Sequence, residues 1–243
     1  MTEPTKPPDA ARLLHELQHS EELKQRPIAG AALDQHMALL RAWQSQRLAQ
    51  TYADLLAELQ YAPACRFFLS DIYGPRDFSQ RDYDIARIHT FLARFLPAQT
   101  VQLLADTVEL NRLTNVLDHD LCEMLFAQLG VIDTITAQQY TDGYRRCNNN
   151  TTRVQQIELT THVLQAVGAG ARLMVVGVAM KLVRVPAQRA GWTELYDFLE
   201  RGYAAFRKVH NIQAFVDTIA KREQRILEQI MANDPNPFRI EED

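Results

Sequence analysis

The sequence predicts an all-α fold, a single-domain multi-helix bundle of about eight to ten helices. Apolar residues recur at helical spacing along most of the 243 residues, as they do on the buried faces of helices. No segment shows the alternation of apolar and polar residues that is typical of a half-buried strand. Prolines, glycines and capping residues separate the apolar-periodic segments, so each segment is expected to form one helix.

The composition is that of a globular protein without a strong charge bias. Hydrophobic residues make up 47% of the chain and charged residues 23%, which argues against general disorder. The formal net charge is −4, so no overall field attracts the chain to nucleic acid or to an anionic membrane. Cys65, Cys122 and Cys147 form no CxxC pair and are expected to be reduced thiols. The N-terminus has no apolar leader, which favours a cytoplasmic location.

Prolines and a capping residue organise the N-terminal part of the chain. Residues 1–8 contain three prolines and are expected to be a flexible arm. Asp9 is placed to cap the first helix, and Pro63 is expected to break or kink the second.

The stretch FFLSDIYGPRDF at residues 67–78 is predicted to be a corner between two helices. Gly74 supplies the left-handed position that ends one helix, and Pro75 prevents that helix from continuing. Asp77 or Ser79 can cap the helix that follows. The helices expected up to this point and directly after it cover residues 9–25, 33–60, 64–73 and 79–95.

Caps and glycines also divide the rest of the chain. Pro97 opens a long helix that is expected to stop at Gly130, and Thr136 begins the next helix. Gly168 and Gly170 are expected to mark a turn between two helices. The helices expected in this part cover residues 97–129, 136–144, 153–167, 171–184, 193–206 and 212–231.

The most apolar stretch, residues 173–185, is predicted to be a buried helix and not a membrane span. A spanning helix needs about 20 apolar residues, and this stretch is shorter and contains Lys181 and Arg184. The whole pattern gives one all-α domain at residues 9–232, followed by a flexible tail at residues 233–243.

The FFLSDIYG string at residues 67–74 carries a resemblance to a known family. Together with residues 186–209 and the Arg-Glu pair at 222–223, it resembles a family of bacterial proteins named for an FFLEELY-type motif. The resemblance covers residues 35 to 232 and implies a small helical bacterial protein with no assigned activity. It transfers no catalytic residue, and the sequence departs from the motif at Ser70, Asp71 and Ile72.

The usual catalytic motifs are absent, but two His–carboxylate pairs stand out. The sequence contains no GxSxG, P-loop, GxGxxG or HExxH motif, which removes the usual supports for hydrolase, nucleotide-binding and zincin functions. The candidates for catalysis are two pairs at helical i, i+4 spacing: His119 with Glu123, and Glu158 with His162. They would form one site only if their helices face each other. The alternative is that both pairs lie on solvated faces, and no metal site is predicted.

A second candidate site combines cations with aromatic residues. These side chains could form a pocket for a small apolar anionic ligand, such as a fatty acid or a phosphate ester. The candidate ligand-binding residues are Asp71, Tyr73, Arg184, Arg189, Arg201 and Tyr203. The alternative is that the cationic side chains are solvated heads on buried stems.

Two classes of function therefore stay open. The first is a non-catalytic cytoplasmic binding protein, either a ligand carrier or a protein-interaction module. The second is an all-α enzyme that uses a His–carboxylate site, with or without a metal. The fold class cannot decide between them, because helical bundles support both. A nucleic-acid partner is not expected, and the sequence does not identify a cofactor.

Overall fold

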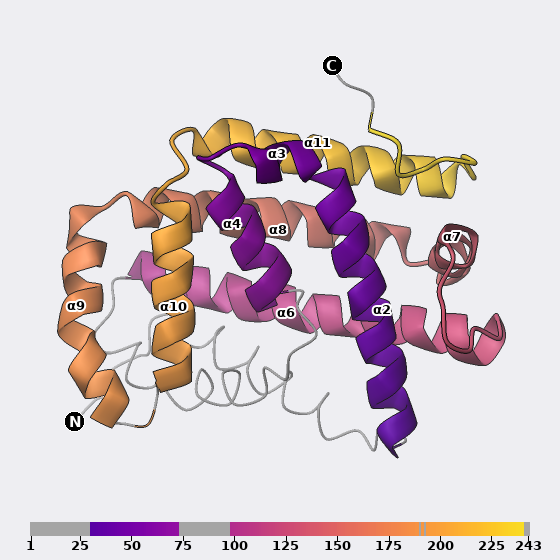
Figure 1. The fold of residues 1–243 in the computed structure, drawn as a ribbon, viewed down its shortest axis with the longest axis horizontal. Helices are drawn as coiled ribbons and strands as arrows, with labels where there is room; N and C mark the ends of the chain where they lie inside the picture. The colour runs from indigo at the N-terminus through magenta and orange to yellow at the C-terminus, as the bar shows by residue number, and fades with distance from the viewer. Residues whose placement is uncertain (1–29, 73–97, 190, 192, 241–243) are drawn as a thin grey trace, which may run out of the picture.

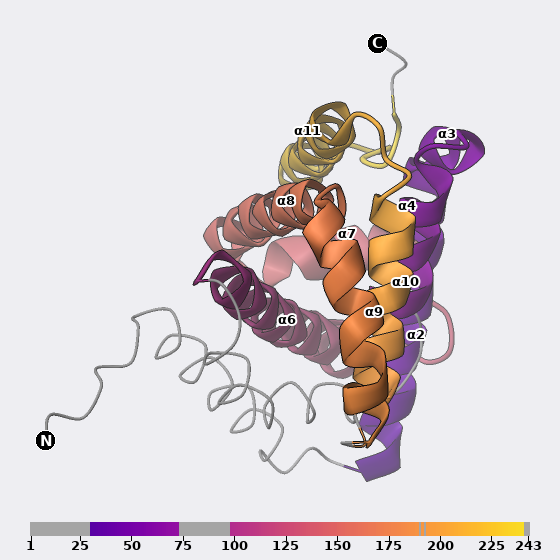
Figure 2. The same cartoon turned by 90° about the vertical axis from the view of Figure 1, so that its left-hand side faces the viewer.

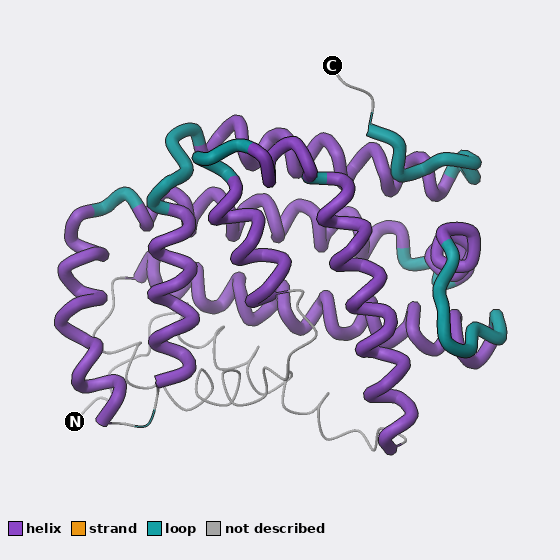
Figure 3. The backbone as a smooth tube through the Cα atoms, in the orientation of Figure 1, coloured by secondary structure: helices purple, strands orange, loops and turns teal. Residues whose placement is uncertain are grey.

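The computed structural model describes residues 30–72, 98–189, 191 and 193–240 (Figure 1). Helices dominate these residues and no strand occurs among them (Figure 3), which confirms the all-α fold class. The predicted arm at residues 1–8, the predicted helices at 9–25 and 79–95, and the predicted corner at Gly74 lie outside the described residues.

Two layers of helices cross each other, as the two perpendicular views show (Figure 1, Figure 2). The long helices of one layer run side by side: α6 (Ala98–Glu123), α8 (Asn150–Ala171) and α11 (Ile212–Met231). The helices of the other layer cross them: α2 (Gly30–Thr51), α4 (Ala62–Phe67), α9 (Met174–Arg189) and α10 (Thr193–Phe206). The remaining elements are α3 (Ala53–Ala57), α7 (Ala137–Arg146) and the π-helical turns η1 (Phe68–Ile72) and η2 (Met124–Gln128).

Two clusters of buried apolar side chains hold the layers together. The larger cluster includes Phe206 of α10 and Phe215 of α11, whose rings meet edge to face with centroids 6.5 Å apart. Each of these side chains is 1% exposed, so its burial stabilises the fold by about 1.5–3 kcal/mol. The smaller cluster joins α2, α6 and α7 around Leu40, Leu121 and Leu125. These contacts fix the crossing of the two layers.

The C-terminal residues also pack against the bundle. Phe238 lies edge to face against Trp43 and Tyr140, with ring centroids 5.7 Å and 6.1 Å away. The sequence predicts a flexible tail at residues 233–243. Phe238 instead packs against the smaller cluster, because an aromatic ring can bury its surface there.

Several helix ends lie where the sequence predicts them. Thr136 caps α7 in a capping box, accepting a hydrogen bond from the Gln139 backbone while the Gln139 side chain accepts one from the Thr136 backbone. Gly130 follows Leu129, the C-cap of η2, and adopts a φ of +67°, which is a left-handed position that favours glycine. The last helix, α11, has the predicted bounds.

The predicted helix at residues 33–60 is confirmed as far as Thr51 and is wrong after it. The chain leaves helical geometry at Tyr52, resumes it in the short α3, and becomes extended at Glu58, where ψ is 123°. Pro63 then lies in the first turn of α4, where its missing N–H costs no helical hydrogen bond. Pro63 therefore opens a helix, whereas the sequence analysis expected it to break one.

The predicted turn at Gly168 and Gly170 is also wrong. Helix α8 continues through both glycines and ends at Ala171. Gly168 is buried, and the side chain of Ile212 occupies the space that a Cβ atom of residue 168 would need. This glycine therefore allows α8 to approach the start of α11 closely.

The sequence predicts a buried helix at residues 173–185, and the structure shows a helix there that is partly exposed. Helix α9 does form, and it continues through Pro186 to Arg189, but it lies at the edge of its layer (Figure 1). It packs mainly against α10 and α8, so the side that faces away from them keeps its apolar residues exposed.

Among the described helices, no single one is both long and apolar enough to cross a membrane. Only α8 and Val176–Leu182, taken together as a bent pair, meet the criteria of length and hydropathy.

Candidate functional site

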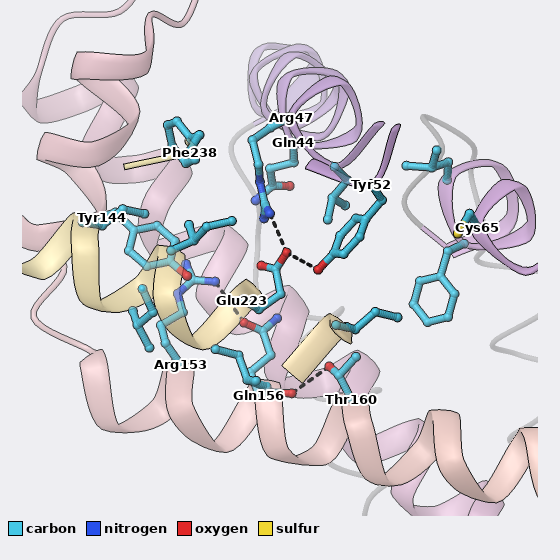
Figure 4. A pocket seen from close by; sticks show the side chains of 18 of the residues that line it. Gln44, Arg47, Tyr52, Cys65, Tyr144, Arg153, Gln156, Thr160, Glu223 and Phe238 are labelled. Carbon is cyan, nitrogen blue, oxygen red and sulfur yellow. Dashed lines mark hydrogen bonds and ion pairs between the residues drawn. The ribbon is translucent and has the colours of Figure 1, made fainter. Parts of the chain in front are cut away.

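A cavity of about 120 Å³ lies where the two layers cross (Figure 4). Side chains from α2, α6, α7, α8 and α11 line it, and Phe238 of the C-terminal tail lies at its wall. Its wall is mainly apolar, but a set of polar side chains also lines it. These are Gln44, Arg47, Tyr52, Asp118, Tyr140, Tyr144, Arg153, Gln156, Thr160 and Glu223.

Helical register carries these polar groups into the interior. Gln44 follows the fully buried Leu40 by four residues, so it lies on the same face of α2. Glu223 lies four residues after Ile219 and four before Leu227, within the apolar face of α11. Polar residues in the register of an apolar face were the sequence signal for this site, and the sequence analysis did not use it.

Arg47, Tyr52 and Glu223 form a hydrogen-bonded triad at the cavity. Arg47 Nη1 donates to Glu223 Oε1 at 2.6 Å, and Tyr52 Oη donates to the same oxygen at 2.8 Å. Burial alone would lower the pKa of Arg47, but Glu223, Tyr140 and Tyr52 together more than offset this and raise the pKa above its ordinary value. Arg47 therefore stays charged, and its Nε atom is buried without a hydrogen-bond partner.

Asp118 lies on the buried face of α6, next to the cavity. It is 3% exposed, and its Oδ1 accepts a hydrogen bond from Gln44 Nε2 at 2.9 Å. Burial raises the pKa of this carboxyl group, and the nearby Arg153 and the Gln44 hydrogen bond offset only part of that shift. Asp118 is therefore part of the buried face of α6.

Arg153 of α8 is the most unusual group in the cavity wall. It is 3% exposed, and its Nη2 and Nη1 atoms donate to the Leu117 carbonyl at 3.1 Å and to Gln156 Oε1 at 3.2 Å. Its guanidinium lies over the ring of Tyr144, 4.3 Å from the centroid, and its Nε atom has no hydrogen-bond partner. No carboxylate of the described residues forms an ion pair with Arg153, whereas buried charges are normally paired.

The charged groups in the cavity wall balance formally. Two guanidinium groups, of Arg47 and Arg153, face the Glu223 carboxylate and the Asp118 carboxyl group. Burial also raises the pKa values of Tyr140 and Tyr144, so both phenols stay neutral. Glu223 already pairs with Arg47, whereas Arg153 donates only to neutral acceptors, so Arg153 is the cation that an entering anion could pair with.

The structure separates the two predicted His–carboxylate pairs. Helices α6 and α8 run antiparallel, as contacts from Gln156 to Thr114 and from His162 to Asp106 show. His162 thus lies beside Asp106, and His119 is thirteen residues (119 − 106) further along α6, about 20 Å away.

None of the four predicted catalytic residues lines the cavity. His119, Glu123, Glu158 and His162 are all exposed. Glu158 and His162 do share an open groove with Glu109 between α6 and α8. Within the described ranges, no group of three or more His, Cys, Asp or Glu side chains could hold a metal ion.

Two of the predicted ligand-binding residues pair with each other. Arg201 donates to Asp71 Oδ1 from Nε at 2.8 Å and from Nη2 at 2.7 Å, which ties η1 to α10. Arg184 and Arg189 are exposed on α9, and Tyr203 packs against Gly177. Tyr73 lies outside the described residues. None of the described members of this set lines the cavity.

The comparison with known families identifies the domain that contains this cavity. A model described as "Domain of unknown function (DUF8198)" matches residues 23–237. The chain belongs to the DUF8198 family. No curated protein and no solved structure gives a significant match. The DUF8198 region is wider than the 35–232 range of the resemblance, and it contains every cavity-lining residue except Phe238.

Proposed function

We propose that the chain is a non-catalytic binding protein whose central cavity holds a small carboxylate with an apolar body. The observation that carries this proposal is Arg153, a buried arginine in the cavity wall that has an unpartnered Nε and no carboxylate in ion-pair contact among the described residues. An unpaired buried charge is costly, so a structural role alone accounts poorly for it. A bound carboxylate would supply the missing acceptor.

The volume of the cavity limits the size of this ligand. At about 120 Å³ the cavity is smaller than most drug-sized sites, which are about 300–1,000 Å³. It is similar to an engineered apolar cavity of about 150 Å³ that binds benzene. We therefore expect a ligand about the size of benzoate. A long fatty acid, which the sequence analysis considered, exceeds this volume.

The chemistry of the wall favours binding over nucleophilic catalysis. The Cys65 thiol lines the cavity, and burial raises its pKa to about 11, which leaves little thiolate near neutral pH. The Tyr52 phenol, whose pKa burial also raises, donates a hydrogen bond to Glu223, keeps its proton and is not activated for attack. These groups can orient a carboxylate, but they supply no activated nucleophile.

The second candidate function is an enzyme with its site in the open groove between α6 and α8. The observation in its favour is the contact between His162 Nε2 and Asp106 Oδ2 at 3.3 Å, since a buried carboxylate can orient a catalytic imidazole. This reading requires turnover of an ester or a phosphate ester that His162→Ala abolishes. The cavity proposal requires no such turnover.

The proposal extends to origin and location. The FFLSDIYG resemblance supports a bacterial protein of the FFLEELY-motif type. A cytoplasmic location is supported by the three free cysteines, because a reducing compartment keeps thiols unpaired. A protein partner stays an additional proposal, because ligand carriers commonly deliver their ligand to one.

Thermal unfolding with benzoate tests the proposal, with benzamide as the neutral control of similar shape. Benzoate at about 100 times its Kd is expected to add about 2.7 kcal/mol to the free energy of unfolding. Benzamide should add much less, because it lacks the charge that Arg153 recognises. Arg153→Met should weaken benzoate binding about ten- to hundredfold, since it removes a hydrogen bond to a charged group.

The matched control is Arg146→Met, which removes an exposed arginine from α7. It should leave benzoate binding unchanged. Without ligand, Arg153→Met is expected to be less stable than the wild type, because the Leu117 carbonyl loses its donor and Asp118 loses the nearby positive charge. Stabilisation by benzoate is therefore compared with the unfolding of the same variant without ligand. Equal stabilisation by benzoate and benzamide, or equal losses in the two variants, would reject the carboxylate site.

A further inference from the structure

Helix α9 carries an exposed apolar stripe. Its members follow each other at positions i, i+4, i+8 and i+11, so they lie on one face of the helix. They are Met174, Val178, Leu182 and Val185, and their exposed fractions are 85%, 52%, 72% and 51%. Large apolar side chains that gather in this way on a surface mark a site of interaction.

The opposite side of α9 is held by α10. Tyr196 Oη donates to the Met180 carbonyl at 3.1 Å, and Tyr203 packs over Gly177, which has no side chain to keep it away. Both contacts lie on faces of α9 that the apolar stripe does not occupy. The stripe is therefore directed outward by the packing of α9.

The charges on α9 are all of one sign. The helix contains Lys181, Arg184 and Arg189 and no acidic residue, although the whole chain has a net charge of −4. All three cations are exposed. The acidic residues nearby belong to α10, where Glu200 lies on the α9 side, 3.3 Å from Tyr196 Oη. Lys181 and Arg189 lie beside the apolar stripe by helical register, whereas Arg184 follows Gly177 by seven residues and lies toward α10. The outer face of α9 thus combines apolar residues with two cations.

These charges decide between two occupants of the face. In a symmetric dimer, the same surface of both copies meets at the interface, so α9 would bring the cations of two copies together. Anionic lipid head groups instead complement the cations, and the apolar side chains can enter the boundary between head groups and acyl chains. Charge complementarity therefore favours a lipid surface over a second copy.

We propose that α9 docks the protein onto an anionic lipid surface. The helix lies parallel to that surface, with Met174, Val178, Leu182 and Val185 inserted and with Lys181 and Arg189 among the lipid phosphates. Helix α9 is about 24 Å long, which suits a helix that lies on a membrane. This contact does not depend on the cavity, because none of these residues lines it.

Vesicle flotation tests the proposal with the full chain. The wild type should float with phosphatidylcholine vesicles that contain phosphatidylserine, and much less with phosphatidylcholine alone. Leu182→Glu should reduce the bound fraction about tenfold or more, because it replaces an inserted side chain with a charge. Raising the salt from about 0.1 M to about 1 M should release the protein, because salt screens the cations.

Two matched variants keep the test specific. Leu59→Glu makes the same change at a leucine that is 92% exposed between α3 and α4, and it should bind as the wild type does. Lys181→Glu should bind less than Arg146→Glu, which causes an equal change in net charge on α7.

Three outcomes would overturn the proposal. The first is no flotation of the wild type with anionic vesicles. The second is an equal loss of flotation in Leu182→Glu and Leu59→Glu. The third is a dimer in analytical ultracentrifugation that Leu182→Glu dissociates, which would assign the face to a second copy.

Discussion

At the scale of the residue, function is suggested by polar side chains that share the register of an apolar face. Asp118 and Arg153 are each 3% exposed, yet they come from different helices and lie at one cavity. Burying both groups costs stability unless they are compensated. Mutation of Asp118 or Arg153 therefore measures how far the surroundings offset the cost of burying each charge.

Asp118→Asn is predicted to stabilise the protein near neutral pH. Burial raises the pKa of Asp118 in the folded state above its ordinary value of 3.8, so the folded state binds the proton more tightly than the unfolded state. Ionisation of Asp118 therefore lowers the free energy of unfolding. This loss is absent at pH values below the pKa of Asp118 in the unfolded state, grows as pH rises to its pKa in the folded state, and is complete above that pKa. Asparagine avoids it and can still accept the hydrogen bond from Gln44.

Urea unfolding over a range of pH measures this difference. The advantage of Asp118→Asn over the wild type should shrink as pH falls toward 3.8. Asp120→Asn is the control, because Asp120 is exposed on the same helix. A variant that is less stable than the wild type at neutral pH would show that the Asp118 charge stabilises the fold.

At the scale of the element, local signals predict helix starts better than they predict packing. The sequence locates the start of α7 because the Thr136 cap and Gln139 are neighbours along the chain. It fails at Gly168, where the reason for glycine is Ile212, a residue of another helix. It also fails for the burial of α9, since an apolar sequence does not reveal whether a helix lies at the edge of a layer.

Two glycines of α8 should respond to alanine with opposite signs. Gly168→Ala is predicted to destabilise the protein by about 1–3 kcal/mol, because the new methyl group meets Ile212. Gly170→Ala is predicted to stabilise it by about 0.5–1 kcal/mol, because its methyl group meets open space and alanine favours a helix.

Urea unfolding of the two alanine variants, measured side by side, checks these signs. The pair is its own control, because the two sites are two residues apart in one helix. Stabilisation by both alanines would show that Gly168 marks a flexible turn, as the sequence analysis expected, and not a close contact between α8 and α11.

At the scale of the whole molecule, the sequence predicts an all-α fold but not the crossing of two layers. Periodicity shows that each helix buries one face, but it does not show which helix covers that face. The pair of Arg47 and Glu223 illustrates this limit, because the two residues are 176 positions apart and meet only when α2 crosses α11. The cavity is a product of that crossing, so the register of Gln44 and Glu223 could mark both side chains as buried but could not show that they line one cavity.

The central claim is that the crossing of the two layers creates a site for a small carboxylate. A crystal structure of the protein grown with benzoate tests it most directly. The account predicts benzoate in the cavity, with its carboxylate within hydrogen-bond distance of Arg153 Nε and its ring against the apolar wall. A cavity that contains only water in the presence of saturating benzoate, or benzoate bound only at surface arginines, would contradict it.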